Sequence, residues 1–275
     1  MLPNKAIPVL AAVVVLGSAA AWYWWPRLAP TPAPPPPVAA PPAPEAPPAI
    51  ANPLPAPDAN AEPLPALADS DAPFAKALEA IPGAGRVGKF LRPENLIRHV
   101  VATIDNLPRR RLAADLRPLQ PTPGAFMVSG GEDQATLDEH NSLRYAPVVA
   151  ILGSLDMRAV NSLYQRYYPL FQRAYQDLGY PQGYFNDRLV AAIDDLLATP
   201  HPTAPLALVR PKVFWEFADP DLEARSAGQK LLLRMGADNA AVVERKLREL
   251  RALVATGAKG KAAGASVGAP TSANQ

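Results

Sequence analysis

Segment 180–188 carries the densest group of side chains that could bind a ligand. It reads Tyr-Pro-Gln-Gly-Tyr-Phe-Asn-Asp-Arg and precedes an apolar pattern with helical spacing. In one interpretation, Asn186 or Asp187 caps this helix and Arg188 forms a local ion pair, as at many helix–loop–helix corners. In the other, Tyr184 and these polar residues form a pocket at the helix N-terminus, where backbone N–H groups favour anions.

The densest positive charge is the run Arg109-Arg110-Arg111, with Arg117 close behind it. Such a run, which here follows a predicted helix and a proline, is usually a solvated surface. The alternative is that Arg109, Arg110 and Arg117 bind an acidic protein or lipid headgroups.

Lys212 and Glu216 lie in a segment that resembles a β-strand. Glu216 stands between Trp215 and Phe217, and neighbouring aromatic rings could remove water from its carboxylate. A satisfied residue at the edge of a strand is the simpler interpretation. Lys212 and Glu216 are both candidates for binding a partner.

The usual signatures of an enzyme are absent from the sequence. There is no cysteine, and the three histidines are far apart without the spacing of metal ligands. Gly83, Gly85 and Gly88 resemble a phosphate-binding loop, but no strand precedes them and no Lys-Ser or Lys-Thr pair follows. The sequence therefore indicates no metal, no cofactor and a binding function rather than catalysis.

Residues 74–255 must position these candidates, and their pattern predicts a compact, mainly α domain with a minor β-hairpin. Eighteen Arg and five Lys face 20 acidic residues there, so the surface is mixed and has no nucleic-acid signature. Helices are expected over 74–81, 96–107, 137–144, 147–152, 156–178, 186–200, 219–235 and 238–254. Short strands are expected over 125–128, 206–209 and 213–217, the last two as a hairpin.

The helix predicted over 156–178 has an aromatic stripe at helical spacing. It contains Tyr164, Tyr167 or Tyr168, Phe171 and Tyr175. Core packing is the ordinary role of such a stripe, and a carbohydrate- or peptide-binding platform is the alternative. Asp156 is expected to cap this helix, and Pro169 to kink it.

Residues 7–25 form an uncharged apolar stretch that ends in four aromatic residues. About 20 apolar residues cross a bilayer as a helix, and aromatic rings favour the membrane–water boundary. The sequence therefore predicts one transmembrane helix in the lipid bilayer, after a short tail of residues 1–6. A secretory signal cleaved after Ala19-Ala20-Ala21 is the alternative.

Residues 26–73 form a predicted linker, which contains 18 of the 35 prolines in the chain. Because proline fixes φ and lacks a backbone donor, neither helix nor sheet extends through such a segment. We expect a disordered, extended stalk that separates the domain from the membrane. Residues 256–275 are small and polar, and a disordered tail is expected there.

Several strings in the domain resemble the proteobacterial domain-of-unknown-function 3014 family. They are TIDNLPRR (103–110), RYAP (144–147), GYFNDR (183–188), EFADP (216–220) and SAGQKLLLRMG (226–236). The resemblance covers about residues 74–254. It implies a membrane-anchored bacterial protein without an assigned activity, so it supplies no catalytic residue.

Together these features predict a non-enzymatic, membrane-tethered adaptor or binding protein of the bacterial cell envelope. We expect a single pass through the inner membrane, a periplasmic helical domain and a protein partner. Positive charge is nearly balanced across the span, with Lys5 before it and Arg27 after it, so a cytoplasm-facing scaffold is an alternative. A hydrolase or transferase of an envelope polymer, using carboxylates such as Asp187 and Glu216, is another.

Overall fold

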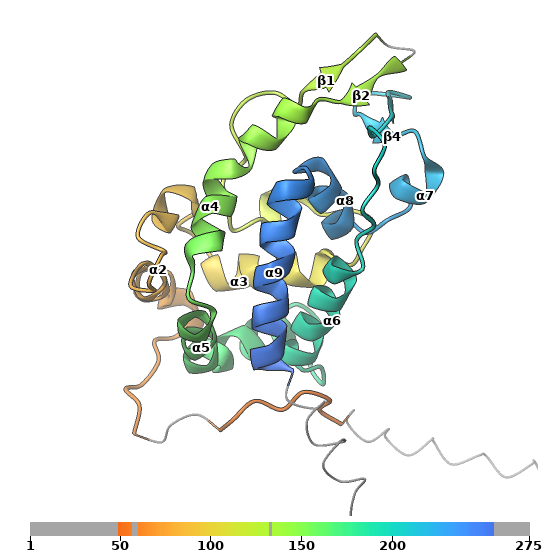
Figure 1. Ribbon diagram of the computed structural model, residues 1–275. Helices are drawn as coiled ribbons and strands as arrows, with labels where there is room; N and C mark the ends of the chain where they lie inside the picture. Colours follow the sequence, from red (N-terminus) through yellow and green to blue (C-terminus); the bar gives the residue numbers. More distant parts are fainter. Residues whose placement is uncertain (1–48, 57–59, 132–133, 256–275) are drawn as a thin grey trace, which may run out of the picture. The chain divides into compact units, whose positions relative to one another are not determined.

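The computed structural model describes residues 49–56, 60–131 and 134–255 (Figure 1). The predicted anchor over residues 7–25, the tail before it, most of the proline-rich linker and the predicted tail 256–275 lie outside the described residues. In the part that is described, no helix has both the length and the apolar character needed to cross a membrane.

Most of the described chain is helical, as the apolar periodicity predicts. The α-helices are α2 (Asp71–Glu79), α3 (Leu96–Asn106), α4 (Ala146–Ser154), α5 (Met157–Asp177), α6 (Phe185–Leu197), α7 (Pro220–Glu223), α8 (Ala227–Arg234) and α9 (Ala237–Val254). Short 3-10 helices are η1 (Leu67–Asp69), η2 (Val87–Phe90), η3 (Ala114–Leu116) and η5 (Glu139–Arg144). The mainly α fold is therefore confirmed.

Two small antiparallel pairs of strands complete the fold. Strand β3 (Leu208–Val209) pairs with β4 (Glu216–Phe217), which is the hairpin that the sequence predicts. Strand β1 (Val128–Ser129) pairs with β2 (Thr136–Leu137) and forms a second hairpin. The strand predicted over 125–128 overlaps β1 only at Val128, and β2 is not predicted. An isolated bridge between Thr136 and Ala207 joins the two pairs.

Helix α9 lies at the centre of the domain and packs against α4, α5, α6 and α8, while α3 packs against α5 and α6 (Figure 1). The largest apolar cluster lies where α3, α5, α6 and the end of α9 meet. The strand pairs lie at the upper end of the domain in this view. Leu208 and Phe217 of β3 and β4 belong to a smaller cluster with Leu233 of α8.

The aromatic stripe of α5 is part of the core, as its spacing predicts. Tyr164, Tyr167, Phe171 and Tyr175 are all buried. The Phe171 ring stacks on that of Phe185 at 5.7 Å between centroids. Asp156 caps the helix by accepting from the backbone N–H of Arg158 at 2.9 Å, which confirms the predicted cap, and α5 continues through Pro169.

The helix predicted over 219–235 is instead two helices, α7 and α8. Ser226 separates them because its hydroxyl caps α8 by accepting from the Gln229 N–H at 3.1 Å. The first N–H groups of α8 also donate to carbonyls that follow α3, from Ala227 to Arg109 at 2.6 Å and from Gly228 to Leu107 at 3.0 Å. The start of α8 is thus fixed by a tertiary contact.

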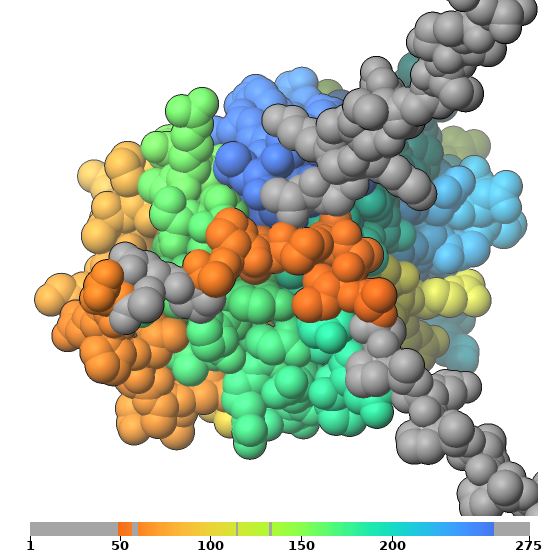
Figure 2. All heavy atoms as spheres, turned by 90° about the horizontal axis from the view of Figure 1, so that it is seen from below, coloured from red at the N-terminus to blue at the C-terminus, as the bar shows by residue number. Residues whose placement is uncertain are grey.

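The end of the predicted linker lies on the helical domain. In the space-filling view of Figure 2, the orange segment passes across the face formed by α5, α6 and the end of α9. Leu54, Leu64 and Leu67 pack against the main apolar cluster. The Arg166 guanidinium donates to the backbone carbonyl of Glu62. The chain therefore contacts the domain before residue 74, where the sequence places the start of the domain.

Candidate functional site

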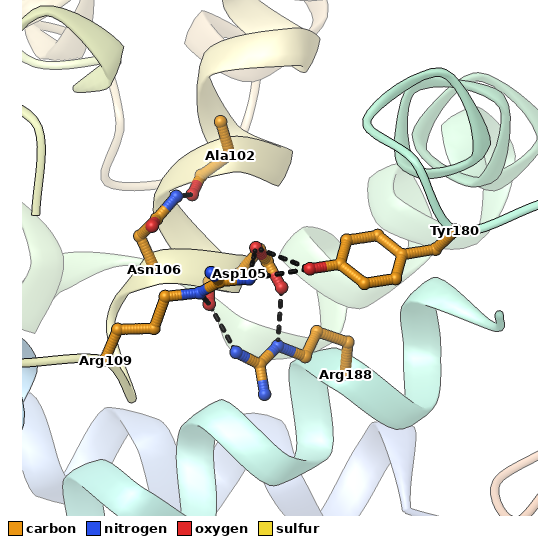
Figure 3. Close-up of polar contacts among 6 residues, drawn as sticks. All are labelled: Ala102, Asp105, Asn106, Arg109, Tyr180 and Arg188. Carbon is orange, nitrogen blue, oxygen red and sulfur yellow. Dashed lines mark hydrogen bonds and ion pairs between the residues drawn. The ribbon is translucent and has the colours of Figure 1, made fainter.

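A cluster of charged side chains joins the end of α3 to the start of α6 (Figure 3). Its centre is Asp105, whose side chain is only 5% exposed. Asp105 Oδ1 accepts from Arg188 Nε at 3.0 Å, and Oδ2 accepts from an Arg109 nitrogen at 2.7 Å. The Tyr180 hydroxyl donates to Oδ2 at 3.3 Å and lies 2.6 Å from the same Arg109 nitrogen.

Two arginines therefore neutralise one buried carboxylate. The Arg188 guanidinium donates also to the backbone carbonyl of Asp105, so it holds the end of α3 at two points. The negative charge of Asp105 raises the pKa of Arg109 above its ordinary value. Because every group of this cluster already has a partner in the chain, its role is to join helices.

The sequence interpretation of these arginines is corrected in two respects. All three arginines are exposed, but Arg109 forms an ion pair with Asp105, whereas Arg110 and Arg117 form none with the residues that the structure describes. The ion pair of Arg188 is not local, because its partner Asp105 lies 83 positions earlier in the chain.

Asn186 and Asp187 form a second polar cluster, which holds the linker. Asp187 Oδ2 accepts from the Ala51 N–H at 3.0 Å, and Oδ1 accepts from the Asn52 N–H at 2.7 Å and from Asn52 Nδ2 at 2.9 Å. Asn186 Nδ2 donates to the carbonyls of Asn52 at 2.8 Å and Val254 at 3.0 Å. This site, the linker clamp, brings together the linker, the start of α6 and the end of α9.

The predicted capping role of Asn186 and Asp187 is wrong. Helix α6 begins at Phe185 after Tyr184, and no side chain of Tyr184 caps it. The Phe185 N–H donates to Gln172 Oε1 of α5 at 2.9 Å. Since α5 supplies this acceptor, the side chains of Asn186 and Asp187 remain available to the linker.

Lys212 and Glu216 lie far from both clusters, in and beside the β3–β4 hairpin. Both residues are exposed, so the aromatic neighbours of Glu216 do not bury it. Phe217 points into the core, whereas Phe214 in the loop is 79% exposed. Helix α6, with Asp187 in its first turn, begins at the opposite end of the domain from β4 (Figure 1). The structure therefore does not bring Asp187 and Glu216 together.

Sequence reasoning missed Asp105, Tyr180 and Asn52 as functional groups. Asp105 and Arg109 are four positions apart, a spacing at which opposite charges pair on a helix, but Arg109 lies beyond the end of α3 at Asn106. The partnership of Asn52 with Asp187 has no comparable local signal, since 135 positions separate them. Across 49–56, 60–131 and 134–255, no three His, Cys, Asp or Glu side chains are grouped so that they could hold a metal ion.

The fold and these clusters define a mainly helical domain. Its buried polar side chains form hydrogen bonds with other parts of the same chain. A family model described as "Protein of unknown function (DUF3014)" matches residues 96–251, which is more than half of the chain. The protein belongs to this family. No curated protein and no solved structure matches the chain.

Proposed function

We propose that this protein is a non-enzymatic, membrane-tethered adaptor of the bacterial cell envelope. In this proposal, residues 7–25 are held in the inner membrane and the helical domain binds a protein partner in the periplasm. The uncharged apolar stretch and its terminal aromatic residues support the tether. The linker clamp supports the same role, because it fixes the end of the linker to a defined place on the domain.

The observation that carries the binding role is the exposed tip of the β3–β4 hairpin, residues 209–215. Val209, Val213 and Phe214 are all exposed there, although side chains of this size are usually buried. Arg210 and Lys212 lie between them, and no acidic residue occurs in the tip. A cluster of exposed apolar groups with charges around it is typical of an interaction surface.

The base of this tip is fixed in the domain. Leu208 and Phe217, which are paired across the two strands, are buried in one apolar cluster. Within the tip, Arg210 Nε donates to the Val213 carbonyl at 3.2 Å, and the guanidinium lies 5.8 Å from the Trp215 ring centroid. A tip that is already ordered loses less entropy when it binds.

The chemistry of the tip defines the partner surface that it fits. Phe214 and Val213 would enter an apolar depression, and Arg210 and Lys212 would face carboxylates at its rim. Charges at a rim mainly affect the rate of association and its salt dependence. Reversal of these two charges should therefore weaken binding most at low ionic strength.

A photo-crosslinking amino acid at position 214 of the full-length chain tests this function in cells. We expect a defined protein adduct at position 214 and none at the exposed control position 94. The double substitution R210E/K212E should reduce the adduct. Adducts with lipid alone, or a protein adduct unaffected by charge reversal, would refute the proposed surface.

The orientation of the chain in the membrane is tested by labelling an introduced cysteine. This is possible because the chain has no cysteine of its own. A single cysteine at exposed position 182 should react with a membrane-impermeant thiol reagent once the outer membrane is permeabilised. Reaction only after the inner membrane is broken would support a cytoplasm-facing scaffold instead.

A further inference from the structure

We infer that the linker clamp is a peptide-binding site for an Asn-Pro segment, and that residues 51–54 of the same chain are its resident ligand. The inference rests on the contacts around Asn186 and Asp187, and it is independent of the hairpin tip. The clamp reads two successive backbone N–H groups, one carbonyl and one side-chain amide. The backbone bends at Ala51 and Asn52, so two successive N–H groups face the same carboxylate. The clamp therefore recognises the peptide mainly by its backbone.

The receptor side of the clamp is held in place by the core. The Tyr164 hydroxyl donates to Asn186 Oδ1 at 3.1 Å. Burial raises the pKa of Tyr164 far above its ordinary value, so this hydroxyl keeps its proton. Asn186 Nδ2 also donates to the Val254 carbonyl, so both ends of the side-chain amide are held in place. The remaining Nδ2 hydrogen is therefore directed at the carbonyl of the bound peptide.

The ligand pattern follows from the contacts. The positions of Ala51 and Asn52 must not be proline, because both donate a backbone N–H to Asp187. Asn52 adds a side-chain donor, and Pro53 disfavours a helical backbone at the residue before it. Leu54 then packs on the main apolar cluster. The class of ligand is thus a peptide with Asn-Pro-Leu after a residue other than proline.

The linker itself contains a natural test of this selectivity. The string Pro-Leu-Pro-Ala occurs at 53–56 and again at 63–66, and both of its leucines, Leu54 and Leu64, pack against the core. Asn52 precedes the first copy, whereas Glu62 precedes the second. A glutamate at the clamp would place its carboxylate beside Asp187 and would lack the amide donor. Asn52 therefore selects the register in which the linker docks.

Because the resident ligand is part of the same chain, it competes with any ligand in solution at a high effective concentration. For short linkers this concentration is on the order of millimolar. A free peptide should consequently bind weakly to the wild-type chain and more tightly when the resident segment is disabled. The substitution N52E disables it with the residue that the second copy carries.

The test uses the full-length chain in detergent and a fluorescent peptide of residues 49–56. We expect anisotropy to show binding to the N52E chain at least about tenfold tighter than to the wild type. The same peptide with Glu in place of Asn should not bind, and the double variant N52E/D187A should lose binding. Equal binding of the two peptides, or no binding to a folded N52E chain, would overturn the inference.

A second measurement avoids any substitution. Hydrogen exchange of segment 49–56 in the wild-type chain should accelerate when unlabelled peptide is added in large excess, because the resident segment is displaced. The Glu-containing peptide should leave this exchange unchanged. Unaltered exchange at the highest concentration of the Asn peptide would show that the clamp is a permanent part of the fold.

Discussion

Arg188 and Asp105 connect α6 to α3 by an ion pair with 3.0 Å between Nε and Oδ1. The carboxylate is 5% exposed and the arginine side chain 24% exposed, whereas Arg109 on the other carboxylate oxygen is 50% exposed. Of the two arginine partners of Asp105, Arg188 is therefore mostly buried and Arg109 is half-exposed. This asymmetry determines how much each arginine contributes to stability.

Removal of Arg188 should destabilise the domain more than removal of Arg109. R188A leaves a buried carboxylate with less compensation and removes the hydrogen bond to the Asp105 carbonyl, so we expect a loss of about 2–4 kcal/mol. R109A removes a more exposed partner, and a loss of about 1 kcal/mol or less is expected. Urea denaturation of both variants measures the two free energies of unfolding. Equal losses would contradict the assigned asymmetry.

Gly83 should not tolerate a side chain, although Gly85 two positions later should. Gly83 has φ +89°, and a Cβ there would lie 2.1 Å from the backbone oxygen of Ser154. G83A should therefore cost at least about 2 kcal/mol. Apart from its chain neighbours, none of the described residues comes within 4 Å of a Cβ on Gly85, so G85A should change stability by less than about 0.5 kcal/mol. Thermal unfolding of the pair provides the comparison, and similar melting temperatures would refute the steric argument.

The sequence predicts the elements of this domain better than their contacts. The apolar spacing between Pro93 and Pro108 predicts a helix over 96–107, and α3 spans Leu96–Asn106. Local signals suffice there because prolines and periodicity act within a few residues. The paired strands around residues 210–215 follow from the same kind of local pattern.

The polar sites could not be predicted in the same way. Arg188 and Asp105 are 83 positions apart, and Asn52 and Asp187 are 135 apart, so only the packed fold brings either pair together. The predicted absence of helix and sheet over 26–73 holds for residues 49–56 but is wrong at its end, where η1 forms and α2 begins at Asp71. The proline pattern contains no information on what the segment contacts. The break before α8 likewise depends on carbonyls that follow α3.

Substitution by alanine should affect stability at Phe217 and partner binding at Phe214. Phe217 is 2% exposed and lies in a core cluster, whereas Phe214 at the hairpin tip is 79% exposed. F217A should lower the free energy of unfolding by about 3–5 kcal/mol. F214A should change it by less than about 0.5 kcal/mol while it weakens partner capture. A large loss of stability in F214A, measured by chemical denaturation, would mean that the tip belongs to the core.

Glu223 should contribute to stability at neutral pH and lose that contribution in acid. Its Oε1 lies 2.6 Å from Lys230 Nζ, and its Oε2 accepts from the Phe217 N–H at 3.0 Å. Desolvation opposes the charged form, but the hydrogen bonds from Lys230 and Phe217 and the charge of Lys230 outweigh it. The pKa of Glu223 therefore lies below its ordinary value of 4.5.

The direction of the pH effect follows from that lowered pKa. The folded state favours the ionised carboxylate, so its contribution is complete above the ordinary value of 4.5 and is lost as pH falls through the folded pKa. The difference in unfolding free energy between wild type and E223Q should be constant near pH 7 and shrink below about pH 4.5. Urea denaturation across this range measures it, with E216Q as the exposed control. A difference that grows in acid would reverse the assigned sign, because it would require a carboxyl group that is more stable protonated in the fold.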